Sequence, residues 1–230
     1  MTPAFYRDQE KYFVSVDCII LGFKNDKLYL LMTNRRFEPL KGQDSLMAGF
    51  IRPSENLTET VQRVVYEYTG IQDMFLEQVG VYSDIGRDIG ERVISIACYA
   101  LVDIQLFDEE LYKTYNARWE ELEKVGKMVF DHNKMVSDAI HILRQKVMTQ
   151  PIGFNLLPEK FTLPQLQRLY EAIYQAPLDK RNFRKKINEM DILDKQEDKD
   201  KSGSKKGAFY YKFNKEKYDA LLEREQYFSL

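Results

Sequence analysis

The stretch GFIRPSENLTETVQRVVYEYTGI (residues 49–71) decides how the first part of this 230-residue chain is interpreted. Its residues Val61, Val64 and Val65 recur at helical spacing, so the pattern predicts an amphipathic helix over residues 58–68. Gly70 follows directly, and glycine is favoured there because it adopts the left-handed backbone of a helix C-terminus without strain. The stretch is therefore expected to form a loop, a helix and a turn.

Apolar runs on both sides of this stretch predict a sheet. Upstream, YFVSVDCIILGF (residues 12–23) is rich in β-branched and aromatic residues, which predicts a buried strand. A turn at residues 25–27 leads to a second expected strand over residues 28–33. Downstream, the pattern predicts two further strands and a long helix, over residues 75–82, 93–102 and about 131–148. These elements together predict a mixed α+β domain.

Residues 49–71 also match a known motif of Gly, five residues, Glu, seven residues and then Arg-Glu-apolar-any-Glu-Glu-any-Gly-apolar. The matching residues are Gly49, Glu55, Arg63, Val65, Glu67, Gly70 and Ile71. In this spacing the stretch resembles the Nudix box, and the flanking strands and helix agree with the Nudix fold. The resemblance implies an N-terminal Nudix-like α/β/α sandwich.

Two positions of the box depart from the pattern. Active members of the family hold Mg²⁺ against a diphosphate with several helix carboxylates, but Val64 and Tyr68 stand at two of those positions here. We therefore expect no catalytic residue, no metal site, no cofactor and no enzymatic activity. Glu55 and Arg63 are expected to form an ion pair, unless Glu67 contacts a ligand. The alternative is a Nudix-type hydrolase of a nucleoside diphosphate or sugar phosphate with a fused nucleic-acid-binding domain.

The chain changes in charge near Gln150, where we place the boundary between a domain over residues 1–150 and a domain over residues 151–230. The formal net charge is only −2. Residues 1–150 carry 18 basic and 23 acidic side chains, whereas residues 151–230 carry 16 basic and 13 acidic ones. A basic part behind an acidic part favours a polyanion as the partner of the second domain.

The order of elements in the second domain predicts a winged helix-turn-helix. The expected elements are a helix capped by Thr162, a break at residues 175–177, a helix capped by Asp179, and strands from residue 192 and over residues 208–213 that enclose a charged loop at residues 195–207. The fold class is thus α+β, with a Nudix-like sandwich followed by a winged helix-turn-helix.

The second of these helices is strongly basic and is expected to bind DNA. Phe183, Ile187 and Met190 share its inward face, and the basic side chains lie opposite. Arginine and asparagine on such a helix suit base edges in the major groove, and lysine suits phosphates. The candidate DNA-binding residues are Lys180, Arg181, Arg184, Lys185 and Asn188 on the helix, with Lys205 and Lys206 in the wing. The alternatives are a solvated helix face, a solvated wing in which acidic residues stand among the lysines, and an RNA-binding or scaffold protein.

Nearly all of the chain resembles the Nudix-related transcriptional regulators of the NrtR type, and within them most closely the arabinose-responsive repressors of the AraR type. The residues behind this resemblance are EKYFVSVDCIILGF (residues 10–23), the degenerate box, FDH (residues 130–132) and FTLPQLQRLYEAI (residues 161–173). The resemblance implies a homodimer that releases double-stranded operator DNA when a small-molecule effector, L-arabinose, binds the first domain.

Asp17 is the most informative residue for the effector site, because it interrupts a run that should be a buried strand. A buried carboxylate is costly unless it is paired or hydrogen-bonded, and a pocket for a hydroxyl-rich ligand can use one as an acceptor. The alternatives are a Lys or Arg partner or an exposed edge. The expected effector-binding residues are Asp17, Lys41, Phe50, Glu67 and Arg92. His132 and His141 are nine residues apart, and we expect them to lie at the surface or cap a helix.

The cysteines and the hydropathy pattern indicate in which cellular compartment the protein is expected. Cys18 and Cys98 each lie in an apolar run without a ligand-spaced neighbour, so we expect two buried, reduced thiols. No apolar stretch approaches the length of about 20 residues that a membrane span needs. A cytoplasmic protein without a membrane partner is therefore expected.

Overall fold

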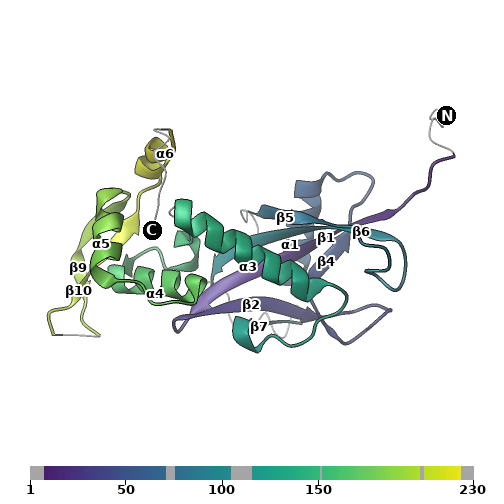
Figure 1. Cartoon of the computed structure of the whole chain (residues 1–230), viewed down its shortest axis with the longest axis horizontal. Coiled ribbons are helices and arrows are strands. Elements are labelled where there is room, and N and C mark those ends of the chain that lie inside the picture. The colour runs from purple at the N-terminus through teal and green to yellow at the C-terminus, as the bar shows by residue number, and fades with distance from the viewer. Residues whose placement is uncertain (1–7, 71–75, 105–115, 151, 203–204, 224–230) are drawn as a thin grey trace.

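A computed structural model of the chain describes residues 8–70, 76–104, 116–150, 152–202 and 205–223. The molecule is elongated, with a large sheet and its helices at one end and a smaller sheet with shorter helices at the other (Figure 1). Helix α3 (His132–Thr149) lies along the large sheet and reaches the smaller part with its C-terminal end (Figure 1).

The large sheet has seven strands. They are β1 (Phe13–Lys24), β2 (Lys27–Asn34), β3 (Asp44–Ser45), β4 (Met47–Phe50), β5 (Glu77–Tyr82), β6 (Val93–Asp103) and β7 (Ala117–Glu121). The order is β3-β2-β1-β6-β5, with β4 paired to β1 and β7 paired to β2. The central strands β1 and β6 are parallel and place Cys18 beside Cys98. Both thiols are buried and free, which confirms that expectation.

Two helices cover opposite faces of this sheet, and successive side chains of β1 point alternately to one helix and to the other. Val16, Cys18 and Ile20 pack against α1 (Leu57–Thr69), whereas Ile19 and Leu21 belong to the apolar core on the side of α3. Asn56 and Glu59 form a capping box at the start of α1, and Gly70 ends it with a φ of 71°. The predicted α/β/α sandwich is thus confirmed. None of the described helices combines the length and the apolar character needed to cross a membrane.

The second part of the chain has the order of a winged helix-turn-helix. Its elements are the 3-10 helix η3 (Phe154–Leu156), β8 (Phe161–Thr162), α4 (Leu163–Tyr174), α5 (Lys180–Glu189), β9 (Leu193–Asp200), β10 (Ala208–Phe213) and α6 (Lys215–Glu223). The strands form one sheet in the order β8-β10-β9. As predicted, Thr162 caps α4 in a capping box with Gln165, and Asp179 caps α5.

One detail of the expected elements needs correction, and two elements were not predicted. The charged stretch from residue 195 is not all loop, because β9 continues to Asp200 by pairing with β10. The segment around Trp119 forms strand β7, which is followed by the 3-10 helix η2 (Leu122–Lys124). The chain also continues after β10 into α6. The strands β7 and β9 depend on pairing with β2 and β10, and the local pattern does not show this pairing.

The two parts pack against each other through a shared apolar core, in which Leu143 and Val147 of α3 lie with Leu166 and Ile173 of α4. The side chain of Arg144 adds a hydrogen bond from Nε to the backbone oxygen of Ile173, at 2.8 Å.

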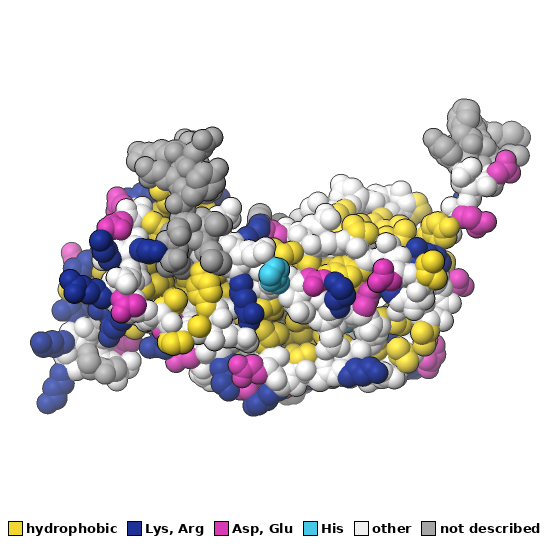
Figure 2. Space-filling model, viewed as in Figure 1, with side chains coloured by type: hydrophobic (Ala, Val, Ile, Leu, Met, Phe, Trp, Pro, Cys, Tyr) yellow, Lys and Arg dark blue, Asp and Glu magenta, His cyan; other side chains and the backbone are white. Residues whose placement is uncertain are grey.

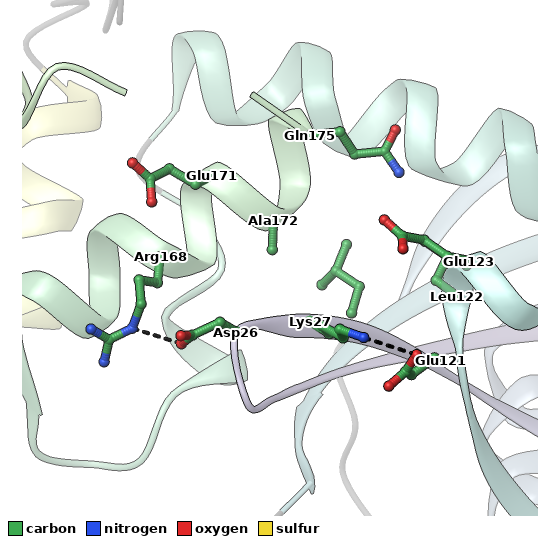
Figure 3. A pocket seen from close by; sticks show the side chains of 10 residues that line it. Asp26, Lys27, Glu121, Leu122, Glu123, Arg168, Glu171, Ala172 and Gln175 are labelled. Carbon is green, nitrogen blue, oxygen red and sulfur yellow. Dashed lines mark hydrogen bonds and ion pairs between the residues drawn. The ribbon is translucent and has the colours of Figure 1, made fainter. Parts of the chain in front are cut away.

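A second contact lies at the turn between β1 and β2. Asp26 there pairs with Arg168 of α4 at 2.6 Å, beside a cleft of about 430 Å³ between the two parts (Figure 3).

Candidate functional site

A cavity of about 320 Å³ opens at the N-terminal end of α3, on the face of the sheet away from α1. Its walls come from β1, β4, the loop after β2, the loop between β5 and β6, and the residues that lead into α3. The charged, polar and aromatic lining residues are Phe13, Ser15, Asp17, Arg35, Phe37, Glu38, Phe50, Arg87, Asp88, Glu91, Phe130 and His132. The cavity has the size of a small-molecule site.

Asp17 lies in this cavity and is only 2% exposed. The Ser95 hydroxyl donates a hydrogen bond to its Oδ2, and Nε2 of His132 lies 3.2 Å from its Oδ1. Burial alone would raise the pKa of Asp17, but the charge and hydrogen bond of His132, together with Ser95, lower it below its usual value. The partner is thus a histidine and a serine instead of the Lys or Arg that the sequence suggested.

His132 is buried, so the expectation of a surface or capping role for it is wrong. Its Nδ1 accepts a hydrogen bond from the backbone N–H of Leu46 at 3.1 Å. Its other ring nitrogen, Nε2, faces Asp17. The residue is the first of α3, and it fixes the start of that helix against β1. His141 is exposed, as expected.

Two arginines line the cavity and are held in place by neighbouring groups. Arg87 forms two hydrogen bonds with Asp131, from Nε at 2.9 Å and from Nη2 at 2.6 Å, and its side chain is 4% exposed. Arg35 donates from Nε to the backbone oxygen of Pro39 at 2.6 Å, and its guanidinium lies 4.8 Å from the ring centre of Phe130. Both guanidinium groups are thus pre-positioned, and the charge of Arg87 is already balanced by Asp131.

Four phenylalanines provide an aromatic lining, namely Phe13, Phe37, Phe50 and Phe130. Three of them are more than half exposed, and the rings of Phe13 and Phe50 contact each other at a centroid distance of 5.3 Å. Exposed aromatic faces at the rim of a cavity are suited to stack on a planar ligand group.

The structure brings together only part of the expected effector set. Asp17 and Phe50 line the cavity, but Lys41, Glu67 and Arg92 do not. Lys41 is exposed on the loop before β3, and Glu67 lies on α1, across the sheet from Asp17. Arg92 donates to the backbone oxygens of Ser83 and Asp84. The sequence missed His132, Arg35 and Arg87; the one signal for Arg87 is its place in the glycine-bearing loop DIGRDIG (residues 84–90).

The degenerate box forms ion pairs. Arg63 holds Glu55 with two hydrogen bonds, from Nε at 2.6 Å and Nη2 at 2.9 Å, which confirms the expected pair. Its Nη1 lies 3.4 Å from Glu67, which Arg52 also contacts at 3.4 Å. The hydrogen bond from Arg63 lowers the pKa of Glu55 to about 2. Both retained carboxylates therefore have arginine partners.

The two substituted positions of the box are filled by other groups. Val64 is fully buried in the core beneath α1, and the guanidinium of Arg36 lies 5.0 Å from the ring centre of Tyr68. Among the described residues, no three His, Cys, Asp or Glu side chains are grouped so that they could hold a metal ion. A Mg²⁺ site takes several oxygen ligands, and Val64 and Tyr68 supply no carboxylate at these two positions.

The basic residues of the second part gather on one end of the molecule, over α5 and the strands β9 and β10 (Figure 2). On α5, Phe183 and Ile187 are buried as predicted, whereas Arg184 is partly buried. The remaining predicted residues of the helix are exposed, namely Lys180, Arg181, Lys185 and Asn188. Lys205 and Lys206 are exposed between β9 and β10.

Two family models match separate parts of the chain. The model of the NUDIX domain matches residues 11–139, which is more than half of the chain. The chain belongs to the Nudix family. The model of the NrtR DNA-binding winged helix domain matches residues 153–213, so the second part is a winged helix domain of that type. The predicted combination of a Nudix domain with a winged helix is therefore confirmed.

Individual relatives fall in two groups. This chain is 28% identical over 215 residues to the ADPR responsive transcriptional repressor NtrR of Acinetobacter baylyi, which covers 92% of this chain and 86% of the relative. It is 33% identical over 141 residues to the ADP-ribose pyrophosphatase of Methanocaldococcus jannaschii, with 57% and 79% covered. The structure of Shewanella oneidensis NrtR in complex with a 27mer DNA is similar with a TM-score of 0.83 at 25% identity, over 94% of this chain and 97% of that one.

Proposed function

We propose that this protein is a transcriptional repressor that binds operator DNA as a homodimer and releases it when ADP-ribose binds the Nudix domain. The relative that covers 92% of this chain is described as an ADP-ribose-responsive repressor, and a similar structure contains DNA. The observation that carries the proposal is the cavity at the start of α3, because the other end of that helix packs against the winged helix domain.

The lining of the cavity suits a nucleotide better than a free sugar. Arginine side chains bind the oxygens of a diphosphate in pairs, and phenylalanine faces stack on a base. Asp17 can accept hydrogen bonds from ribose hydroxyls. The expectation of L-arabinose assumed a cleft without strong positive charge. Arg35 and Arg87 line this one together with the carboxylates of Asp17, Glu38, Asp88 and Glu91, so the two guanidinium groups, and not a net positive charge, favour a diphosphate. None of the relatives described above is named for that sugar, and we replace it with ADP-ribose.

Helix α3 provides the route from effector to DNA. His132 at its start contacts Asp17, and Arg144, twelve residues later, holds the backbone of Ile173. Twelve residues of helix span about 18 Å. Ile173 lies in the last turn of α4, just before the turn that leads to the basic helix α5. A ligand that shifts the start of α3 therefore changes the position of the winged helix domain.

The effector must bind the DNA-free conformation more tightly than the DNA-bound one, because a ligand with equal affinity for both shifts nothing. By reciprocity, DNA then weakens effector binding by the same factor. We also propose that the effector is released intact, since both box carboxylates are paired with arginines and Val64 and Tyr68 supply no metal ligand.

The proposal is tested with a duplex selected from a random DNA library by this protein. Titration calorimetry measures binding of ADP-ribose, AMP and L-arabinose with and without that duplex. We expect ADP-ribose to bind most tightly, and its affinity to fall roughly 5- to 150-fold in the presence of the duplex. Equal affinity for ADP-ribose in both states contradicts the switch, and binding of L-arabinose in preference to ADP-ribose contradicts the effector.

The alternative is an ADP-ribose hydrolase with a fused DNA-binding domain, and the 33% identity to an ADP-ribose pyrophosphatase is the observation in its favour. It is distinguished by turnover, which the repressor proposal does not require.

A further inference from the structure

The strand β9 at the edge of the winged helix domain carries both acidic and basic side chains. Two of its acidic side chains are paired with groups outside the strand. Asp194 accepts a hydrogen bond from Asn214 at 2.8 Å and pairs with Lys217 at 3.2 Å. Asp198 pairs with Lys160 at 3.2 Å. These two carboxylates are thus held by groups of their own domain, which reduces their repulsion of an approaching polyanion, whereas Glu197 on the same strand is exposed.

Two lysines of the same strand lie on one aromatic ring. The Nζ atoms of Lys195 and Lys199 are 3.7 Å and 4.1 Å from the ring centre of Phe209 on β10. The register explains how both reach it: Lys199 pairs with Phe209 and Lys195 with Tyr211, so four residues along β9 oppose two along β10. This bulge shortens the distance between two lysines that are four residues apart, so that both contact one ring.

Two ammonium groups on one ring repel each other, and the ring offsets only part of that repulsion. Among the residues that the structure describes, the ion pairs of the β9 carboxylates Asp194 and Asp198 go to Lys217 and Lys160 and not to Lys195 or Lys199, and both of these lysines are exposed. An anion that contacts both ammonium groups removes the repulsion. The contact with Phe209 also orders the two side chains beforehand, which lowers the entropy cost of binding.

The pair faces the side of the hairpin on which the helices lie. Lys195 and Lys199 share a face with Tyr211, which packs against the apolar core that contains α4 and α5. The exposed basic residues of α5 and this hairpin belong to the same basic end of the molecule (Figure 2). A duplex that contacts α5 therefore meets a basic end of the molecule to which β9 also contributes exposed lysines.

We propose that Lys195 and Lys199, ordered on Phe209, form a phosphate clamp that binds the backbone of duplex DNA, a role that rests on the proposed function of the chain. The clamp reads no base, because ammonium groups on a phosphate position the protein and carry no sequence information. It is distinct from Lys205 and Lys206, which lie in the connection between the two strands.

The test uses the full-length protein and a fluorescently labelled 30-bp duplex of random sequence, with anisotropy titrations at several salt concentrations. Lys195→Gln and Lys199→Gln each weaken binding roughly three- to fivefold and each lower the slope of log affinity against log salt by about one. The double variant lowers it by about two. Lys127→Gln, an exposed lysine of the Nudix domain, is the matched control and leaves the slope unchanged.

Phe209→Leu tests the contribution of the aromatic ring separately from that of the two lysine charges. It keeps both lysines, so the salt slope stays near that of the wild type while the affinity falls, because the side chains lose their ordering surface. Thermal unfolding of each variant identifies any loss of folding. A double variant with the wild-type slope overturns the clamp alone, whereas a wild type that binds no duplex DNA overturns both the clamp and the proposed function.

Discussion

The Nε2 atom of His132 lies 3.2 Å from the Oδ1 atom of Asp17, and both side chains are buried at the cavity. This contact joins the central strand β1 to the first residue of α3. It also keeps Asp17 ionised, because His132 and Ser95 outweigh the burial that would raise its pKa. A single contact thus links the cavity, the core sheet and the helix that reaches the DNA-binding domain.

Asp17→Asn removes the charge without changing the size of the side chain. We expect the free energy of unfolding to fall by about 1–3 kcal/mol, because His132 and Ser95 lose their charged acceptor. ADP-ribose binding is expected to weaken, since the cavity loses a carboxylate acceptor. Urea denaturation and titration calorimetry measure the two effects.

Glu67→Gln is the matched control, because Glu67 is exposed on α1 across the sheet from the cavity. It is expected to leave ADP-ribose affinity within twofold of the wild type, roughly 0.4 kcal/mol. If Glu67→Gln weakens binding as much as Asp17→Asn does, the effector does not occupy this cavity.

The pair of Glu55 and Arg63 predicts a defined acid dependence of stability. The pKa of Glu55 is about 2 in the folded protein, below its ordinary value of 4.5, mainly because Arg63 donates hydrogen bonds to it. A carboxyl whose pKa is lower in the folded state stabilises that state above its ordinary pKa and loses the contribution as the pH falls through the folded value. The contribution is therefore complete near pH 7 and is lost between about pH 5 and pH 2.

Glu55→Gln tests this window. The variant is expected to be less stable than the wild type at pH 7, with the difference shrinking as the pH falls toward 2. Urea denaturation at a series of pH values measures it. A difference that stays constant across the series would mean that the carboxylate charge contributes nothing.

The sequence predicts the core of this architecture well. The helical spacing of residues 58–68, the caps Thr162 and Asp179, and the interruption of β1 by Asp17 are all local signals, and each has a structural counterpart. His132 was misjudged because its partner Asp17 is far away in the sequence. The arginines of the cavity come from loops, and no periodic pattern marks which loop residues turn inward.

The hairpin of β9 and β10 is a second place where the local sequence does not predict the contacts. Its composition suggested a solvated loop with acids among the lysines, and the strand pairing that sorts those charges depends on β10. The bulge that brings Lys195 and Lys199 onto Phe209 is a property of the register between two strands. Composition gives the net charge of such a segment, but only the pairing shows which charges remain available to a partner.

The box predicts that the protein does not hydrolyse ADP-ribose. Incubation with Mg²⁺ or Mn²⁺ is expected to give no AMP above background, and Glu67→Gln is expected to give the same result. Metal-dependent turnover that Glu67→Gln abolishes would contradict the prediction and favour the hydrolase.

A carboxylate restored at residue 64 is expected to cost stability. Val64 is fully buried and its methyl group occupies the space beside Gly49. Val64→Glu therefore buries a charge without a partner, and we expect the free energy of unfolding to fall by about 3 kcal/mol or more. Thermal and urea denaturation measure this. A variant as stable as the wild type would show that the position accepts a metal ligand.

The bond from Arg144 to the backbone oxygen of Ile173 predicts how the effector signal reaches the DNA. Arg144→Ala removes the hydrogen bond that ties α3 to the last turn of α4. We expect ADP-ribose to bind as in the wild type, because Arg144 lies about 18 Å along the helix from His132. The factor by which ADP-ribose lowers DNA affinity is expected to shrink about fivefold, which corresponds to about 1 kcal/mol for one hydrogen bond.

His141→Ala is the matched control for this variant. His141 lies on the same helix, is exposed and contacts Gln145 of α3 itself, so its loss is expected to leave the coupling unchanged. Anisotropy titrations of the selected duplex at zero and saturating ADP-ribose give the coupling for each protein. Wild-type coupling in Arg144→Ala would mean that the signal passes through the shared apolar core or the contact of Asp26 with Arg168, whereas coupling lost equally in both variants would indicate a general loosening of α3.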